Sequence, residues 1–297
     1  MLSTEPTAYA VDTVLVDASQ ADAAWATRVA NFGMRVRFDR PSRTLPVTLT
    51  GANCALHCRH CAGHYLQHMH PIDDLQTEGM ASCLISGGCD PQGRVPVASH
   101  LSQIARLHEH LRLNWHVGMI DEDTMRTIAP FVDVVSFDVV GDAATVQEVY
   151  GLPFDLDDYL REMAMLVRYA RVVPHITIGL RAGHLYGEER ALEAMVGLPI
   201  DRLVLNVLMP TPGTDYADSD PPPLPEVARL FVKARLLLSN IPLIVGCMRP
   251  YGRYRQSVDE LAVRVGLNGL VNPTQRALRV AEALDMQIEW GEECCAL

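Results

Sequence analysis

The chain has 297 residues, of which 48% are hydrophobic, so it can bury a large core, and its mean hydropathy is +0.07. A net charge of −11 and a pI near 5.4, without any lysine- and arginine-rich block, argue against a nucleic-acid backbone as the main partner. No apolar run approaches the roughly 20 residues that a membrane span requires, and residues 1–17 resemble neither a secretory signal nor a transit peptide, so we expect a cytoplasmic protein.

Residues 1–45 are predicted to form an N-terminal extension with a helix around 21–32 and an exposed strand or hairpin at 34–45. From residue 45 onward, short apolar runs alternate with amphipathic segments. The predicted strands are 46–50, 81–86, 114–119, 132–139, 172–180, 202–209, 241–245 and 267–271. The predicted helices are 101–111, 123–130, 156–169, 188–195, 225–238, 257–265 and 275–284.

This alternation favours right-handed βαβ units and a parallel sheet. Eight strands favour a closed (β/α)8 barrel of the TIM type over an open sheet, and one barrel accounts for residues 46–286. Residues 287–297 then form a C-terminal tail that contains cysteines. Active sites of such barrels lie at the C-terminal ends of the strands, so the segments after each strand are the place to look for chemistry.

Three cysteines, Cys54, Cys58 and Cys61, follow the first strand of the repeat in the sequence CALHCRHC. Three thiolates on one loop can each bind one iron of a [4Fe–4S] cube, which leaves the fourth iron with an open coordination site. Zinc is the alternative, because structural zinc sites have four Cys or His ligands. The histidines that could complete such a site are His57, His60 and His64.

The CxxxCxxC spacing after a first strand resembles the signature of the radical S-adenosylmethionine (SAM) enzymes. This resemblance implies that the open iron binds the amino and carboxylate groups of SAM. Reduction then splits SAM into methionine and a 5′-deoxyadenosyl radical, which abstracts hydrogen from an unactivated C–H bond. The sequence departs from the family at His60, where many members have an aromatic residue.

Ser86, Gly87 and Gly88 follow the second strand and are similar to the radical SAM segment whose backbone carbonyls bind the SAM amino group. The alternative is an ordinary glycine turn. Ser136 and Asp138 lie two apart on the fourth strand, and therefore on one side of it. A carboxylate among valines needs a partner, which could be the ribose of SAM or a structural hydrogen bond at the strand end.

The fifth strand carries His175 and Thr177 on one face, followed by Arg181. We interpret His175 as a core histidine rather than a ligand. Arg181 could bind the carboxylate of SAM, since guanidinium pairs with carboxylates through two parallel hydrogen bonds. The alternative for Arg181 is a surface salt bridge with Glu188 or Glu189.

The remaining cysteines could hold a second, auxiliary cluster. Cys89 and Cys247 follow predicted strand ends, and Cys294 and Cys295 lie on the tail, which can fold back. The alternative for each is a small buried hydrophobe, which is also our interpretation of Cys83, inside the second strand. We expect several other histidines to be solvated: His68, His70, His108 and His110.

Five segments, GANCALHCRHCAGHYLQHM, SGGCDPQGRVP, HITIGL, LMPTPGT and GCMRP, together resemble the biotin synthase-like branch of the radical SAM enzymes across residues 45–273. They are most similar to small homologues that form one half of an archaeal-type, two-component lipoyl synthase. The resemblance implies sulfur insertion at C6 or C8 of an octanoyl chain on a carrier protein, such as a lipoyl domain or a glycine cleavage H-like protein. It also implies an auxiliary cluster as sulfur donor, a second radical SAM subunit and a reductant such as ferredoxin.

One departure bears on the sulfur source. Single-chain lipoyl synthases bind their auxiliary cluster with an N-terminal CxxxxCxxxxxC motif, whereas residues 1–53 contain no cysteine. Biotin synthase-like and hydrogenase-maturase-like radical SAM enzymes are alternatives that share the barrel and the first cluster. A non-catalytic iron–sulfur or zinc module would bind metal without cleaving SAM, but the long strand–helix repeat and the SGG segment argue against it.

Overall fold

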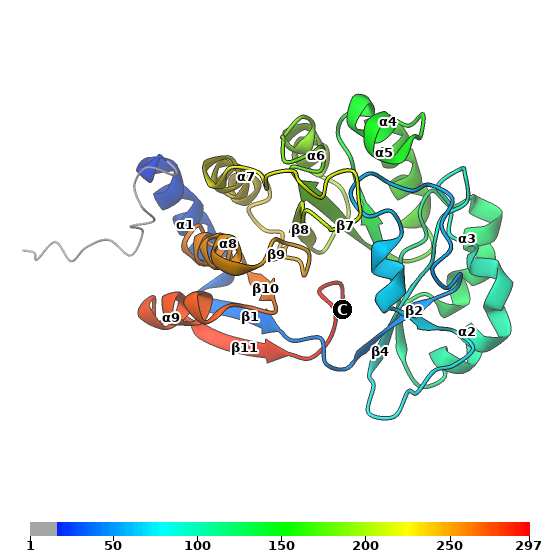
Figure 1. Cartoon of the computed structure of the whole chain (residues 1–297). Coiled ribbons are helices and arrows are strands. Elements are labelled where there is room, and N and C mark those ends of the chain that lie inside the picture. The colour runs from blue at the N-terminus through cyan, green and yellow to red at the C-terminus, as the bar shows by residue number, and fades with distance from the viewer. Residues whose placement is uncertain (1–16) are drawn as a thin grey trace, which may run out of the picture.

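The computed structural model describes residues 17–297, in which eleven parallel strands form one curled sheet (Figure 1). The strands are β1 (Arg35–Asp39), β2 (Thr44–Thr48), β3 (His70–Pro71), β4 (Ser82–Ser86), β5 (Arg112–Trp115), β6 (Val134–Asp138), β7 (Arg171–Ile178), β8 (Leu203–Val207), β9 (Leu243–Val245), β10 (Gly269–Val271) and β11 (Gln287–Gly291). Across the sheet, their order is β11, β1, β10, β9, β8, β7, β6, β5, β4, β2, β3.

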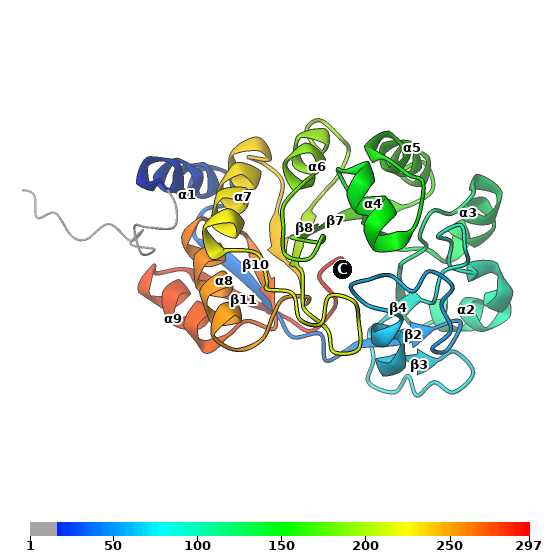
Figure 2. The same cartoon turned by 45° about the horizontal axis from the view of Figure 1, so that its top comes forward.

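The helices surround the outer side of this sheet (Figures 1 and 2). The α-helices are α1 (Ala18–Phe32), α2 (Leu101–His108), α3 (Glu122–Ile128), α4 (Ala143–Tyr150), α5 (Leu156–Leu166), α6 (Glu188–Ala194), α7 (Leu224–Leu237), α8 (Gly252–Arg264) and α9 (Gln275–Ala283). Three short 3-10 helices, η1 (His64–His68), η2 (Val97–His100) and η3 (Ala129–Phe131), lie in the connections. Within residues 17–297, no helix is long and apolar enough to cross a membrane.

The α/β barrel class predicted from the sequence is confirmed, and all eight predicted strands are present. The expected closure is wrong, because β3 and β11 are the two free edges of an open sheet. In the described residues the chain passes directly from β1, near one edge, to β2, near the other, and these two strands do not pair.

The expected boundaries at residues 45 and 287 cut through the sheet. Residues 1–16 lie outside the described part, but α1 packs on α7 and β1 pairs with both β10 and β11. A strand is present within the predicted 34–45 segment, but the expected exposure is wrong, because Val36 and Phe38 are buried in the core. The hairpin alternative is also wrong, because β1 pairs with β10 and β11. The tail likewise contributes β11, so both segments complete the same barrel.

Helix α4 was not predicted, although its sequence carries a recognisable start. Asp142 is its N-cap, and the Asp142 carboxylate accepts a hydrogen bond from the Thr145 backbone amide at 2.8 Å. Gly151 ends the helix in the left-handed conformation, at φ 70°. The helix buries Val146 and Val149 against the barrel.

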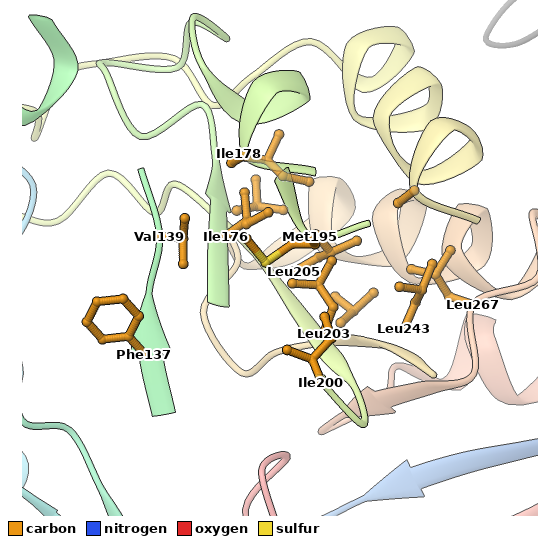
Figure 3. Close-up of a cluster of buried hydrophobic side chains, with 14 of the residues drawn as sticks. Phe137, Val139, Ile176, Ile178, Met195, Ile200, Leu203, Leu205, Leu243 and Leu267 are labelled. Carbon is orange, nitrogen blue, oxygen red and sulfur yellow. The ribbon is translucent and has the colours of Figure 1, made fainter. Parts of the chain in front are cut away.

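Alternate residues of each strand point to opposite sides of the sheet. The outer set packs against the helices, as Figure 3 shows for a cluster that includes Phe137, Ile176, Leu205 and Leu243. The inner set forms two layers. The lower layer is apolar and contains Val134, Val173, Val204, Ile244 and Val271.

The chain after β11 fills this lower layer. Gly291 and Glu292 run beside the β1–β2 connection, where their carbonyls accept hydrogen bonds from the amides of Arg40 and Arg43. Residues 295–297 then enter the barrel and pack on the lower layer, so the C-terminal segment lies at the centre of Figure 1. Here the tail occupies space that stacked side chains fill in a closed barrel.

Candidate active site

A cavity of about 430 Å³ opens at the C-terminal ends of the strands, above the apolar lower layer. The loop after β2 contributes Cys54, Cys58 and Cys61 to its wall, and the segment after β4 contributes Gly87 and Gly88. Side chains of the inner strand faces form its base. The position at the carboxyl ends of the strands is the one expected for a barrel active site.

The cysteine loop is held in place by its own backbone. The amides of Cys61 and Ala62 donate to the Cys58 carbonyl at 3.0 and 2.8 Å, and the Ala55 amide donates to the Cys89 carbonyl at 2.8 Å. Ala62 has φ 43°, a left-handed conformation that non-glycine residues rarely adopt. These contacts turn the three thiols toward the cavity that they line.

Gly88 allows this loop to pass directly over the β4 end. A Cβ on Gly88 would lie 1.8 Å from the Asn53 carbonyl oxygen, so no side chain fits. The Gly88 amide donates to Thr50 Oγ1 at 2.7 Å, and that hydroxyl donates to the Asn53 carbonyl at 2.9 Å. Glycine at position 88 is therefore required by the close approach, beyond any need for a turn.

The thiols of Cys58 and Cys61 interact with each other. A hydrogen bond from Cys58 lowers the pKa of Cys61 to about 5, and the same bond, together with burial, raises the pKa of Cys58. The nearby imidazoles of His60 and His64 also lower the pKa of Cys61. The loop thus favours a thiolate, which is the form that binds iron.

The cavity contains acceptors without partners. No backbone amide in residues 17–297 donates to the carbonyl oxygens of Gly87 or Gly88. Asn206 Oδ1, on β8, is buried without a partner. A buried acceptor without a partner is costly, so these atoms fit a bound ligand with donor groups, such as the amino and hydroxyl groups of SAM.

Ser136 and Asp138 both line the cavity, but their environments differ. Ser136 is buried, and its hydroxyl donates to Asn114 Oδ1 at 2.9 Å. Asp138 was expected to be a buried carboxylate, and this is wrong: it is exposed, because β6 ends at the open cavity. Asp138 therefore needs no protein partner and is available to a ligand.

Arg181 does not line the cavity. Its Nε donates to Glu148 Oε2 at 2.5 Å, and its guanidinium stacks on Tyr186. Its partner is thus Glu148 on α4, in place of the predicted Glu188 or Glu189. The Glu188 carboxylate instead accepts a hydrogen bond from the Gly179 backbone amide at 2.8 Å.

The structure separates the four candidate auxiliary cysteines into two groups. Cys89 lies beside the cysteine loop, close enough for the charges of Cys54 and Cys61 to affect its pKa, which burial raises to about 12. Cys247, Cys294 and Cys295 line the same cavity and are close enough for their charges to interact. Cys83 lies outside both groups, fully buried in the main core.

The histidines also separate clearly. His175 is buried at the base of the cavity, and burial lowers its pKa to about 4. His116 lines the cavity next to His175, with the two ring centroids 5.8 Å apart. His57, His68, His70 and His110 are exposed, and His108 is half-buried beside Asp133.

Sequence reasoning missed Asn114, His116 and Asn206, which all contribute to the cavity or its support. Asn114 on β5 and Asn206 on β8 alternate with apolar residues, and His116, directly after β5, continues the same period-2 pattern. That interruption was the available signal. Within residues 17–297, no three His, Cys, Asp or Glu side chains form a preformed site for a single metal ion.

Comparison with known proteins defines the class of fold. No protein-family model and no curated protein sequence matches the chain. Among solved structures, methylornithine synthase (PylB) has TM-score 0.63 and 14% identity over 91% of this chain and 88% of that chain. HydG, a maturase of the [FeFe]-hydrogenase, has TM-score 0.64 and 14% identity over 85% of this chain and 60% of HydG.

A second HydG, from Carboxydothermus hydrogenoformans, has TM-score 0.64 and 12% identity over 91% of this chain and 71% of that chain. The chain is therefore an α/β barrel of the fold seen in methylornithine synthase and HydG. It spans 60% of the length of one HydG, so the shared fold covers only part of that enzyme.

Proposed function

We propose that the chain is a radical SAM enzyme. The observation that carries this proposal is that Cys54, Cys58 and Cys61 line one cavity with Gly87 and Gly88, and that Cys54 packs against Gly88. The fold shared with HydG supports it, since hydrogenase-maturase-like radical SAM enzymes are one of the alternatives that share the barrel and the first cluster.

The chain's own residues have distinct roles in this proposal. Cys54, Cys58 and Cys61 hold a [4Fe–4S] cluster, which together with SAM supplies a 5′-deoxyadenosyl radical. The carbonyls of Gly87 and Gly88 accept hydrogen bonds from the amino group of SAM. The side-chain oxygens of Ser136, Asp138 and Asn206 accept hydrogen bonds from its hydroxyl groups. Arg181 has no role, because its guanidinium pairs with Glu148 outside the cavity.

We further propose that the radical serves to insert sulfur into an octanoyl chain on a carrier protein. Unactivated methylene carbons have neither an acidic proton nor a leaving group, so a radical is needed to functionalise them. The thiols of Cys247, Cys294 and Cys295, in the cavity of the cysteine loop, could hold the sulfur donor. The fatty chain, a second radical SAM subunit and a ferredoxin-like reductant are the partners of this reaction.

The cavity lining supports an apolar substrate. Leu56, Leu66, Met69, Val95 and Leu152 contribute to its wall. Burial of each methylene group contributes about 0.8 kcal/mol to binding. An extended fatty chain would therefore gain more from this wall than a small polar substrate would.

The reaction can be tested with the full chain, reconstituted without oxygen and incubated with SAM and dithionite. The substrates are a peptide that contains octanoyl-lysine and, for the biotin synthase-like alternative, dethiobiotin. Sulfur gain by the octanoyl peptide, detected by mass spectrometry, supports the proposal. Sulfur gain by dethiobiotin alone favours the biotin synthase-like alternative. If SAM is cleaved but neither substrate gains sulfur, the chain catalyses a different radical SAM reaction.

A further inference from the structure

Hydrogen bonds from the surrounding barrel hold the tail cysteines in place. The carbonyl oxygen of Cys295 accepts a hydrogen bond from Arg202 Nη1 at 3.0 Å, and that of Ala296 accepts one from Arg171 Nη2 at 2.8 Å. The Cys294 amide donates to Thr44 Oγ1 at 2.9 Å. Three strands thus fix the backbone on both sides of the two thiols, so their positions are set by the fold.

A histidine ring nitrogen lies beside these thiols. His175 Nε2 lies 3.9 Å from Cys295 Sγ, and Cys295 Sγ lies 3.9 Å from Cys294 Sγ. His175 is only 5% exposed, so its ring nitrogens face the protein interior and the base of the cavity. A buried ring nitrogen beside two thiols is a common metal-binding arrangement.

The other ring nitrogen fixes the tautomer. His175 Nδ1 lies 3.0 Å from the Val173 carbonyl oxygen, and a carbonyl can only accept, so Nδ1 carries the proton. Neutral His175 therefore presents the lone pair of Nε2 toward Cys295. Metal-ligating histidines almost always donate their second ring N–H to a carbonyl, carboxylate or water, which is the arrangement seen here.

Cys294 also has the surroundings of a metal ligand. Asn114 Nδ2 donates to Cys294 Sγ at 3.3 Å, and Asn114 Oδ1 accepts the Ser136 hydroxyl at 2.9 Å. Hydrogen bonds to ligand sulfurs stabilise the thiolate form and tune iron–sulfur centres. Ser136 thereby supports a thiol, in addition to lining the cavity.

We propose that His175, Cys247, Cys294 and Cys295 are the four ligands of a second iron–sulfur cluster, and that Cys89 is not one of them. This inference deepens the sulfur-insertion proposal and rests on it for its purpose, whereas the ligand set is argued from the one cavity that all four residues line and from the contacts of Cys295 with His175 and Cys294. Cys89 is excluded because its carbonyl accepts a hydrogen bond from the Ala55 amide at 2.8 Å, which fixes Cys89 to the Cys54–Cys61 loop. A neutral imidazole in place of a thiolate would also raise the cluster's reduction potential.

The test uses the full chain with Cys54→Ala, Cys58→Ala and Cys61→Ala, so that iron bound to the first loop is removed. This variant is reconstituted without oxygen, and its iron and sulfide are measured. Pulsed electron paramagnetic resonance of the reduced protein, with and without ¹⁵N-labelled histidine, then detects a nitrogen bound to iron. We expect retained iron and a nitrogen coupling that changes with the label.

Three additional substitutions in this background define the ligands. His175→Cys should keep the iron and abolish the nitrogen coupling, since a thiolate replaces the imidazole. Cys294→Ala should remove most of the iron. Cys89→Ser should retain both the iron and the coupling, and so should the matched control Cys83→Ser. Circular dichroism confirms that each variant is folded.

Iron that is retained without nitrogen coupling would overturn the assignment of His175, and loss of iron in Cys89→Ser would overturn the exclusion of Cys89. Absence of iron from the triple variant would overturn the second cluster altogether. That last result leaves the radical SAM proposal intact if the unsubstituted chain still cleaves SAM. If the unsubstituted chain holds iron but does not cleave SAM, the proposed function fails while the second site can still stand.

Discussion

Gly88 lies directly beneath Cys54: a Cβ on Gly88 would come within 2.6 Å of the Cys54 Cα and 1.8 Å of the Asn53 carbonyl oxygen. The first cysteine of the loop and the glycine pair after β4 are therefore one structural unit. Their packing makes the loop position depend on residue 88.

Gly88→Ala should displace the cysteine loop, because the added methyl group overlaps backbone atoms that cannot move aside. We expect at least a tenfold loss of SAM cleavage and reduced iron content after reconstitution. Gly87→Ala is the matched control, since its Cβ would meet only side chains, the nearest being Val95 Cγ1 at 3.1 Å. Equal iron content and activity in both variants would contradict the proposed packing.

Asn206→Ala removes the buried Oδ1 that has no protein partner. If this atom accepts a hydrogen bond from SAM, its loss should weaken SAM binding about tenfold, which corresponds to about 1.4 kcal/mol. Isothermal titration calorimetry on the reconstituted protein measures the change. Asn31→Ala, on the exposed side of α1, is the control. Unchanged SAM affinity in Asn206→Ala would remove Asn206 from the site.

Arg181→Gln should leave SAM affinity unchanged, since the Arg181 guanidinium pairs with Glu148 and does not line the cavity. The salt bridge is partly exposed, so its loss should lower the free energy of unfolding by less than about 1 kcal/mol. Calorimetry with SAM and urea denaturation measure the two effects. A marked loss of SAM affinity would restore the sequence-based prediction that Arg181 binds SAM.

Leu297→Ala should destabilise the apo protein, because Leu297 is buried against the lower layer of the barrel. Truncation of a buried leucine costs about 2–5 kcal/mol. Leu236→Ala on α7 is the control: Leu236 is 40% exposed, and surface substitutions usually change stability by less than about 0.5 kcal/mol. Urea denaturation that gives the same small change for both would show that residues 295–297 do not plug the barrel in solution.

Glu162 should make stability depend on pH. Burial raises its pKa to about 7, from an ordinary value of 4.5, and its Oε1 has no partner. The folded state therefore binds more protons than the unfolded state between these values. Its contribution to stability is present at pH 4.5 and is lost as the pH rises through 7.

Glu162→Gln removes this titration. The variant should be more stable than the unsubstituted protein at pH 8, and its free energy of unfolding should vary less between pH 5 and pH 8. The exposed Glu78→Gln is the control and should keep the original pH dependence. Urea denaturation of the apo proteins at both pH values provides the comparison, and parallel profiles for all three proteins would rule out the role of Glu162.

Local sequence patterns were sufficient to predict the eight central strands, because each is a short apolar run followed by a turn and an amphipathic helix. They also placed Cys54, Cys58, Cys61, Gly87 and Gly88 at one end of the barrel. The places of β1 and β11 within the sheet were not predictable in this way. Strand β1 is alternating and charged, and β11 carries Trp290, which is 52% exposed, so neither has the composition of a buried strand.

The position of the tail and the partner of Arg181 depend on contacts between residues far apart in the chain, which local sequence patterns do not reveal. The entry of residues 295–297 into the barrel depends on Arg171 and Arg202, more than 90 residues earlier in the chain. The partner of Arg181 depends on α4, a helix that the sequence analysis missed. The prediction that Asp138 is buried was wrong for a similar reason. Its neighbours in the sequence are valines, but its side chain is exposed because β6 ends at the open cavity.

The central claim is that this chain cleaves SAM with a cluster held by Cys54, Cys58 and Cys61. The most direct measurement is 5′-deoxyadenosine formation by the chain, reconstituted without oxygen and supplied with SAM and dithionite. The account predicts 5′-deoxyadenosine and methionine from the unsubstituted chain and neither from the variant with Ala at the three cysteines. A chain that binds zinc instead of iron, or that holds a [4Fe–4S] cluster and leaves SAM intact, would contradict it.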